Sequence, residues 1–254
     1  MNQRMFKQLG ILLSFLLVFA QMSFAQPLAT QAAVLEQAVT ITAIDIDGES
    51  VIETEAVEFE KGDTAWDVLD EVAGDLNYEE SEYGKMLQGI NGVIPDFDNN
   101  GAYWAFIVNG EAASVGLDSY EVEHGDNILA AVTDNSSKDM KVNVSATNDS
   151  EEYVVEKTEV TLAPHATAYD AIVQATEDID VSVDDQFFTF INNINQYDME
   201  ENDFWEINSN NEALDVGGLS YQVQPGEHIQ LKLQTFDSGS NQDQEEDEKV
   251  SEDE

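Results

Sequence analysis

An internal duplication is the feature that most constrains what this chain can fold into. Residues 103–128 align without a gap on residues 204–229, and 11 of the 26 aligned positions are identical. The identical pairs are Trp104/Trp205, Asn109/Asn210, Glu111/Glu212, Ala112/Ala213, Val115/Val216, Gly116/Gly217, Ser119/Ser220, Tyr120/Tyr221, Val122/Val223, Gly125/Gly226 and Ile128/Ile229. The repeated unit has the length of a complete small domain, so the sequence predicts two tandem copies of one fold.

The predicted domain organisation follows from this duplication and from changes in composition. The segments are 1–25 as a signal peptide, 26–38 as a linker, 39–133 as the first repeat, 134–139 as a second linker, 140–236 as the second repeat, and 237–254 as a tail. The tail is dominated by acidic and other polar residues and has too little apolar surface to form a core. We therefore expect it to be disordered.

Each copy shows the same order of predicted elements: two strands, one helix and three strands. In the first copy the expected strands are 39–46, 51–59, 86–94, 102–108 and 126–132, with a helix over 64–73. In the second copy they are 141–145, 153–162, 187–194, 204–209 and 228–236, with a helix over 167–177. Apolar residues alternate with polar ones in the strands and recur at three- and four-residue steps in the helices. One helix on a mixed sheet in the order ββαβββ is an α+β fold of the β-grasp type.

Both predicted helices begin with the same capping pattern. Thr64 is followed three residues later by Asp67, and Thr167 and Asp170 repeat the arrangement. In such a box, each side chain accepts a hydrogen bond from the backbone amide of the other residue. The offset between these positions is 103, so a two-residue length change separates the helices from the aligned strands.

The first 25 residues have the layout of a secretory signal peptide. Arg4 and Lys7 give a positive start, residues 10–20 are almost wholly apolar, and Ser23-Phe24-Ala25 supplies a cleavage site. A membrane anchor is the alternative, but the apolar run is shorter than the roughly 20 residues that span a bilayer. We expect cleavage and a secreted, extracellular protein, either free or associated with the cell surface, that is not an integral membrane protein.

The charge of the chain restricts its partners. It has 53 acidic residues against 9 lysines and arginines, and a formal net charge of −44. Such a surface repels nucleic acid and anionic lipid. Because the acids are spread along the whole chain, we favour adaptation to a saline or alkaline medium over one specific cationic partner, which remains the alternative. The chain has no cysteine, which excludes thiolate metal sites and a cysteine nucleophile.

Short motifs in the first copy resemble those of a known family. They are Ile90-Asn91-Gly92, Tyr103-Trp104, Asn109-Gly110-Glu111 and Gly125-Asp126. This pattern is similar to the C-terminal domain of transcobalamin and intrinsic factor, which also occurs in bacterial surface proteins.

The resemblance covers residues 39–133 closely and 140–236 more loosely. In the second copy, Asn210-Asn211 and Ile191-Asn192-Asn193 take the places of the two Asn-Gly motifs. The resemblance implies a β-grasp-like fold and, from the best-known members, one half of a clamp around cobalamin. The other half is a helical barrel, and this chain carries no long helical segment of that kind.

The repeated aromatic pairs are the main candidates for ligand contact. In Tyr103-Trp104 and Phe204-Trp205, neighbouring side chains point to opposite faces of a strand. We expect each tryptophan to anchor the core against the helix and its neighbour to be partly exposed. The alternative is an aromatic platform for a planar or sugar-like ligand. The predicted ligand-binding residues are Tyr103, Trp104, Asn91, Asn109, Phe204 and Trp205.

An acidic segment before the fourth predicted strand begins like an EF-hand calcium loop, with Asp96, Asp98 and Asn100 in the ligand positions. Such a loop needs an acidic residue at its twelfth position, where this chain has Ile107. We expect an acidic hairpin loop, with a weak calcium site as the alternative, and assign no metal site.

No catalytic pattern is present. The histidines His124, His165 and His228 lack metal-ligand spacing, and no nucleophile elbow or phosphate-binding glycine loop is found. We predict a protein that is not an enzyme and needs no cofactor. The patterns favour a secreted, non-catalytic binding or interaction module for a cobalamin-like small molecule or a neutral glycan. The alternative is a structural or adhesive cell-surface repeat protein that contacts other proteins.

Overall fold

The computed structural model describes residues 34–82, 84–184, 188–200 and 202–236. All of them belong to one compact unit. The predicted signal peptide (1–25) and acidic tail (237–254) lie outside the described residues. Within the described residues, no helix has the length and apolar character that crossing a membrane requires.

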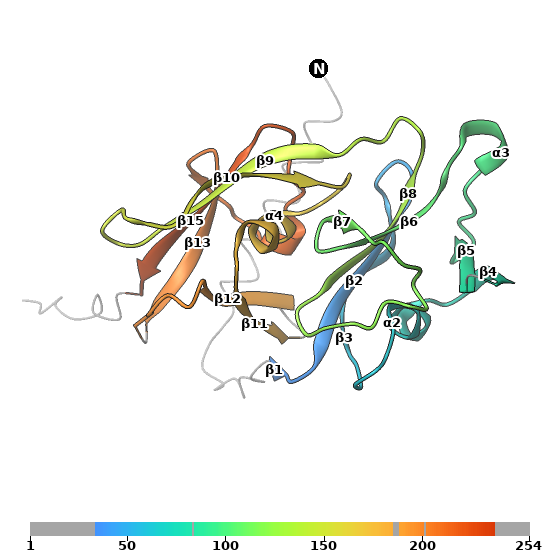
Figure 1. Cartoon of the computed structure of the whole chain (residues 1–254), viewed down its shortest axis with the longest axis horizontal. Helices are drawn as coiled ribbons and strands as arrows, with labels where there is room; N and C mark the ends of the chain where they lie inside the picture. Colours follow the sequence, from blue (N-terminus) through green and yellow to red (C-terminus); the bar gives the residue numbers. More distant parts are fainter. Residues whose placement is uncertain (1–33, 83, 185–187, 201, 237–254) are drawn as a thin grey trace, which may run out of the picture. The chain divides into compact units, whose positions relative to one another are not determined.

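Each copy is an α+β domain made mostly of strands (Figure 1). The first copy contains β2 (Ala38–Ile44), β3 (Ser50–Glu58), α2 (Ala65–Val72), β4 (Leu76–Ser81), β5 (Gly84–Ile90), α3 (Phe97–Asn100), β6 (Tyr103–Val108), β7 (Glu111–Ala112) and β8 (Asn127–Thr133). The second contains β9 (Met140–Thr147), β10 (Tyr153–Leu162), α4 (Ala168–Ala175), β11 (Ile179–Asp184), β12 (Phe188–Ile194), β13 (Asp203–Ser209), β14 (Glu212–Ala213), the 3-10 helix η2 (Gly218–Ser220) and β15 (His228–Thr235). A two-residue strand, β1 (Val34–Leu35), forms within the range predicted as a linker.

The main sheet has the same topology in both copies. Its strand order is β3-β2-β8-β6-β7 in the first copy and β10-β9-β15-β13-β14 in the second. The pairs β2·β8 and β9·β15 are parallel, and the other pairs in these sheets are antiparallel. A parallel pair needs a long crossover connection, and in each copy that connection includes the helix.

The predicted order ββαβββ is incomplete, because each copy has one more strand after its helix, paired outside the main sheet. β4 pairs with β5, and β11 pairs with β12, as antiparallel hairpins in separate sheets. The sequence of β4 is mostly polar and exposed, so it gives no alternating apolar signal. In β11, Ile179, Val181 and Val183 do alternate with polar residues, so this strand was predictable.

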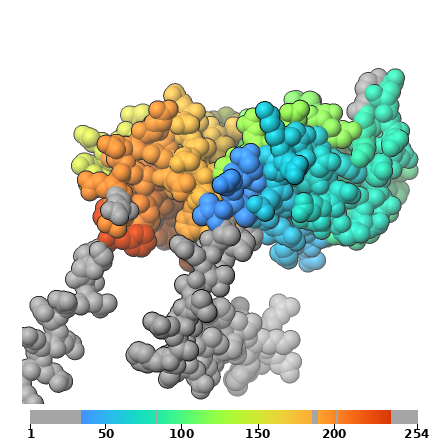
Figure 2. All heavy atoms as spheres, turned by 90° about the horizontal axis from the view of Figure 1, so that it is seen from below, coloured from blue at the N-terminus to red at the C-terminus, as the bar shows by residue number. Residues whose placement is uncertain are grey.

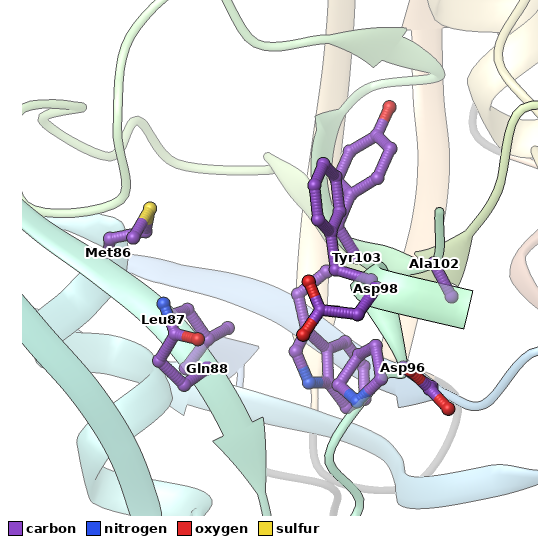
Figure 3. Close-up of a pocket in the computed structure, with 10 residues that line it drawn as sticks. Met86, Leu87, Gln88, Asp96, Asp98, Ala102 and Tyr103 are labelled. Carbon is purple, nitrogen blue, oxygen red and sulfur yellow. The ribbon is translucent and has the colours of Figure 1, made fainter. Parts of the chain in front are cut away.

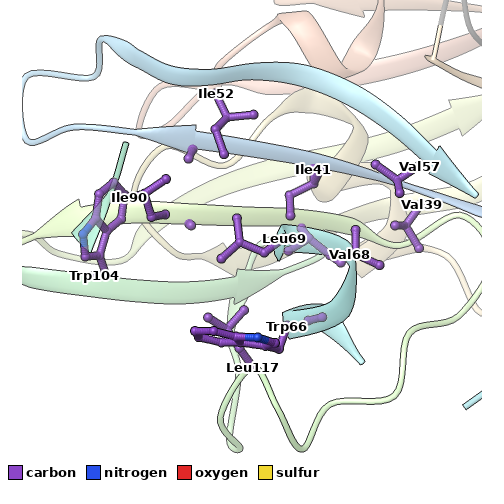
Figure 4. Close-up of a cluster of buried hydrophobic side chains, with 14 of the residues drawn as sticks. Val39, Ile41, Ile52, Val57, Trp66, Val68, Leu69, Ile90, Trp104 and Leu117 are labelled. Atoms are coloured by element: carbon purple, nitrogen blue, oxygen red, sulfur yellow. The ribbon is translucent and has the colours of Figure 1, made fainter. Parts of the chain in front are cut away.

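The core of each copy lies between its helix and its main sheet. In the first copy, Val68 and Leu69 of α2 pack in one cluster with Ile41 and Trp104 of the sheet (Figure 4). In the second copy, Ile172 of α4 has the equivalent place. Burial of each such side chain contributes about 1.5–3 kcal/mol.

Both predicted capping boxes are confirmed. The Thr64 N–H donates to Asp67 Oδ2 (2.8 Å), and the Asp67 N–H donates back to Thr64 Oγ1 (3.4 Å). The Thr167 N–H donates to Asp170 Oδ2 (2.7 Å), with the return bond at 3.3 Å. The hydrogen bonds from Thr64 lower the pKa of Asp67 because they stabilise its ionised form.

The two copies also contact each other within the described unit. The Ala163 N–H donates to the Gly110 carbonyl (2.7 Å), and the Tyr169 hydroxyl donates to the Gly125 carbonyl (2.7 Å). The side-chain amide of Asn127 donates to Asp170 Oδ1 (2.9 Å), and burial of this carboxyl raises its pKa. One apolar cluster at the contact consists of Ile44, Ile107, Leu129, Ala131 and Ala163. In addition, β1 pairs with β11, and Figure 2 shows the blue start of the described chain against the second copy.

Two glycines of the first copy fit this contact because they have no side chain. A Cβ at Gly125 (φ +87°) would lie 2.6 Å from Val181 Cγ2. A Cβ at Gly110 (φ +79°) would lie 2.8 Å from both Asp170 Cβ and Leu162 Cδ2. At Gly226, which aligns with Gly125, φ is +85° and a Cβ would meet nothing within 4 Å. The second copy therefore keeps this glycine for its backbone conformation alone.

Candidate functional site

A cleft lies beside the aromatic pair of the first copy, between the β4–β5 hairpin and β6. Its volume is about 630 Å³, within the range of small-molecule sites. Figure 3 shows Met86 and Leu87 on one side of this first cleft and Asp98 and Tyr103 on the other. The complete lining is Met86, Leu87, Gln88, Pro95, Asp96, Phe97, Asp98, Ala102, Tyr103 and Trp104.

The second copy has a cleft at the equivalent place, between β12 and β13. Its volume is about 550 Å³. The lining is Tyr169, Thr189, Phe190, Ile191, Phe204, Trp205, Glu206, Ile207, Leu214, Val216, Gly217, Gly218, Ser220 and Phe236. Phe204 stacks on Phe236, with ring centroids 4.3 Å apart, and this contact fixes the orientation of Phe204. Both predicted aromatic pairs thus line a cleft.

In each aromatic pair the tryptophan is buried and its neighbour is partly exposed, as expected. Trp104 and Trp205 are 9% and 7% exposed and belong to the cores, which confirms that they anchor the fold. Figure 4 shows Trp104 beside Ile90 at one end of the core cluster. Tyr103 is 50% exposed, and Phe204 is half-buried.

Each of the two tryptophans has a hydrogen-bond donor without an acceptor. Within the described residues, the indole Nε1 of Trp104 and that of Trp205 are buried and have no hydrogen-bond partner. A buried donor without an acceptor costs about 1–3 kcal/mol. The same cost therefore occurs twice, at equivalent positions that line the two clefts.

The clefts differ in charge. Asp96 and Asp98 line the first, whereas Glu206 is the one acidic residue that lines the second. Neither set of lining residues includes a lysine, arginine or histidine. Both clefts therefore suit neutral or cationic ligands, and the first suits cations better.

The predicted site residues Asn91 and Asn109 line neither of these two clefts, and their side chains make structural hydrogen bonds. Asn91 Oδ1 accepts hydrogen bonds from the backbone amides of Gly74 (2.9 Å) and Asp75 (3.1 Å), and its Nδ2 donates to the Val51 carbonyl (3.3 Å). These contacts connect the end of α2 to β3. Asn109 Oδ1 accepts from the Asn127 N–H (2.8 Å) in the β6–β7 turn.

The structure corrects the alignment of the Asn91 motif in the second copy. Asn195, not Asn192 or Asn193, is its counterpart. Asn195 Oδ1 accepts from the backbone amides of Glu177 (2.9 Å) and Asp178 (3.3 Å), and both asparagines have a positive φ, 48° for Asn91 and 49° for Asn195. The alignment of Ile191-Asn192-Asn193 was wrong because a further length change lies between the helix and this strand.

The acidic segment forms a single helical turn, α3, in place of the expected loop. Asp96 caps it by accepting from the Asn99 N–H (3.1 Å), and Asn100 Oδ1 accepts from the Ala102 N–H (2.9 Å). Two of the three calcium-ligand candidates are thus engaged in local bonds. Among the described residues, no group of three or more histidine, aspartate or glutamate side chains is placed to hold a metal ion.

Comparison with known proteins places both copies in one family. The model of a family described as a domain of unknown function (DUF4430) matches residues 62–133 and again residues 166–235. The two matches cover more than half of the chain and lie within the predicted repeats 39–133 and 140–236. They confirm the tandem duplication.

Two solved structures with similarity to the chain each cover less than half of it. A protein from Ruminococcus gnavus ATCC 29149, described as a candidate metal binding protein, is 22% identical with a TM-score of 0.33, over 39% of this chain and 99% of that one. Haptocorrin in complex with Cbi is 20% identical with a TM-score of 0.34, over 41% of this chain. The chain spans about a quarter (26%) of the haptocorrin chain. Haptocorrin belongs to the transcobalamin family, to which the sequence motifs predicted a resemblance. No curated protein matches the chain.

Proposed function

We propose that this chain, which belongs to the DUF4430 family and carries two tandem copies of its domain, is a non-catalytic module that binds ligand in its two clefts. We also propose that each copy is a β-grasp-like domain, which the central parallel strand pair and its helical crossover support. The predicted signal peptide (1–25) motivates a secreted or cell-surface location.

The unsatisfied tryptophan in each cleft carries this proposal. The two copies have diverged in their turns, in their hairpins and in the lining of their clefts. They nevertheless keep Trp104 and Trp205, each with a buried indole N–H that lacks an acceptor. A phenylalanine or leucine would fill the core without that cost. A ligand that brings a hydrogen-bond acceptor to the indole would offset it.

The lining indicates the kind of ligand. Exposed aromatic and aliphatic side chains surround few polar groups, which is the usual character of a small-molecule site. Sugar rings and corrinoids combine apolar faces with many hydrogen-bond acceptors. A neutral glycan and a cobalamin-like compound are therefore the small-molecule candidates, the second also because of the transcobalamin resemblance.

The test is titration of the full chain with a panel of corrinoids and neutral glycans, followed by calorimetry and tryptophan fluorescence. Trp104→Phe and Trp205→Phe keep the aromatic ring and remove the N–H. Each should weaken binding in its own cleft about fivefold, because a net hydrogen bond contributes about 1 kcal/mol.

Trp66→Phe is the matched control. Trp66 lies in the core under the ammonium of Lys85 (4.4 Å) and lines neither cleft. Its replacement should leave affinity unchanged. Equal losses in all three variants, or no binding of any ligand class to either cleft, would rule the proposal out. Capture of a protein partner at a surface away from both clefts would favour the adhesive alternative.

A further inference from the structure

Among the described residues, the edge of β6 that faces away from β8 has no strand partner beside the first cleft; this is its outer edge. β8 pairs with all of β6 on the inner side, but β7 covers only Ile107 and Val108 on the outer side. The Ala113 N–H donates to the Phe106 carbonyl (2.9 Å), so the backbone groups of Phe106 point to the outer edge. Because this direction alternates along an antiparallel strand, the N–H and C=O of Trp104 point to the same edge, beyond the end of β7.

Trp104 therefore has three polar groups without a hydrogen-bond partner among the described residues. Its backbone N–H and C=O lie on an edge without a partner strand in the described residues, and its indole N–H is buried without an acceptor. A strand edge is the typical docking site for an extended peptide, whose backbone supplies both donors and acceptors at matching intervals.

The charge of the first cleft indicates the side chains of that peptide. Asp96 is engaged as the cap of α3, but Asp98 has no hydrogen-bond or ion-pair partner among the described residues. Tyr103 beside it is half exposed. A free carboxylate next to an aromatic ring suits an ammonium or guanidinium group. The nearby Lys85 is already placed over the Trp66 ring, and the chain has a net charge of −44.

We infer that the first cleft binds an extended peptide containing lysine or arginine, which adds as a strand to the outer edge of β6. The inference rests on the proposed function, since it names the ligand of one of the two clefts. The peptide backbone pairs with Trp104, a peptide carbonyl accepts from the indole, and a basic side chain reaches Asp98.

The probe is a fluorescein-labelled peptide of about eight alternating lysine and valine residues, titrated with the full chain by fluorescence anisotropy. Two further peptides are N-methylated, one at every lysine nitrogen and the other at every valine nitrogen. Alternate N–H groups of a bound strand point to opposite edges. One methylated peptide should therefore lose about tenfold or more in affinity, and the other should bind nearly as well as the parent.

Variants locate the bound peptide. Asp98→Asn should weaken binding about threefold or more, whereas Asp149→Asn, in the exposed β9–β10 turn, removes the same charge and should have little effect. Trp104→Phe should weaken binding about fivefold, and Trp205→Phe should not.

Equal behaviour of the two methylated peptides, equal effects of Asp98→Asn and Asp149→Asn, or no binding of the parent peptide would each overturn the inference. Corrinoid or glycan binding that depends on Trp104 would then leave the proposed function intact. Absence of binding by peptides, corrinoids and glycans alike removes both.

Discussion

The aligned glycines Gly125 and Gly226 allow us to measure how much close packing between the copies affects the free energy of unfolding. Both have nearly the same positive φ, +87° and +85°. They differ in surroundings, because a Cβ on Gly125 would lie 2.6 Å from Val181 Cγ2, whereas one on Gly226 would meet nothing within 4 Å. Replacing each by alanine therefore separates the cost of backbone strain from the cost of steric overlap.

The expected magnitudes follow from these two terms. Alanine in a left-handed conformation costs about 1–2 kcal/mol, which both variants share. Gly125→Ala also forces Val181 or the backbone to move, and overpacking of this kind typically costs about 1–3 kcal/mol. We expect Gly226→Ala to lower the free energy of unfolding by about 1–2 kcal/mol and Gly125→Ala by about 2–5 kcal/mol.

The assay is urea unfolding followed by tryptophan fluorescence, with Val181→Ala added to complete a double-mutant cycle. Val181→Ala should recover part of the loss in Gly125→Ala by making room, which gives a coupling energy of about 1 kcal/mol or more. The same Val181 substitution should show no coupling with Gly226→Ala. Equal losses for the two glycine variants, or no rescue by Val181→Ala, would refute a packed contact between the copies at this position.

Three further predictions concern charge, pH and the two equivalent asparagines. Because the chain has a net charge of −44, its melting temperature should rise as salt screens self-repulsion, and a flat profile from low to molar salt would contradict this. Burial lowers the pKa of His165 from 6.5, so the folded state disfavours its protonation and stability should fall as pH drops below that value. His165→Asn should weaken this dependence, and asparagine tolerates the local φ of +67°. Part of the dependence should remain, because burial also lowers the pKa of His228. A pH-independent difference between variant and wild type in free energy of unfolding would argue against the contribution of His165. Asn91→Ala and Asn195→Ala should each cost about 1–3 kcal/mol in chemical unfolding, since both leave backbone amides without acceptors, and a loss at only one position would contradict their equivalence.

Features that depend on neighbouring residues were predictable from the sequence. The capping boxes at Thr64 and Thr167 need only a threonine and an aspartate three residues apart, and both form. The burial of Trp104 followed from strand alternation and its repetition in the second copy. These signals lie within a single element, so tertiary packing had little opportunity to override them.

The lining of the clefts was not predictable in the same way. Phe97, Phe190 and Phe236 lie outside the aligned motif, and each lines the same cleft as one of the two tryptophans. No periodicity in the sequence indicates that the β4–β5 and β11–β12 hairpins lie apart from the main sheets. The role of Asn195 was likewise hidden, because two length changes between the copies shift it out of a gap-free alignment.

The contact between the copies also explains their most visible divergence. The Asn109-Gly110 turn of the first copy is Asn210-Asn211 in the second, which on sequence alone suggests that the second copy is the more distant family member. A Cβ at Gly110 would lie 2.8 Å from Asp170 Cβ, so this glycine is required where the copies meet. Asn211 is exposed, has a positive φ of 72°, and exchanges hydrogen bonds with the Gln230 side chain (2.7 and 3.0 Å). The glycine therefore reflects the position of the first copy in the tandem rather than its ligand. The loss of the second Asn-Gly turn is thus no reason to assign binding to the first copy alone.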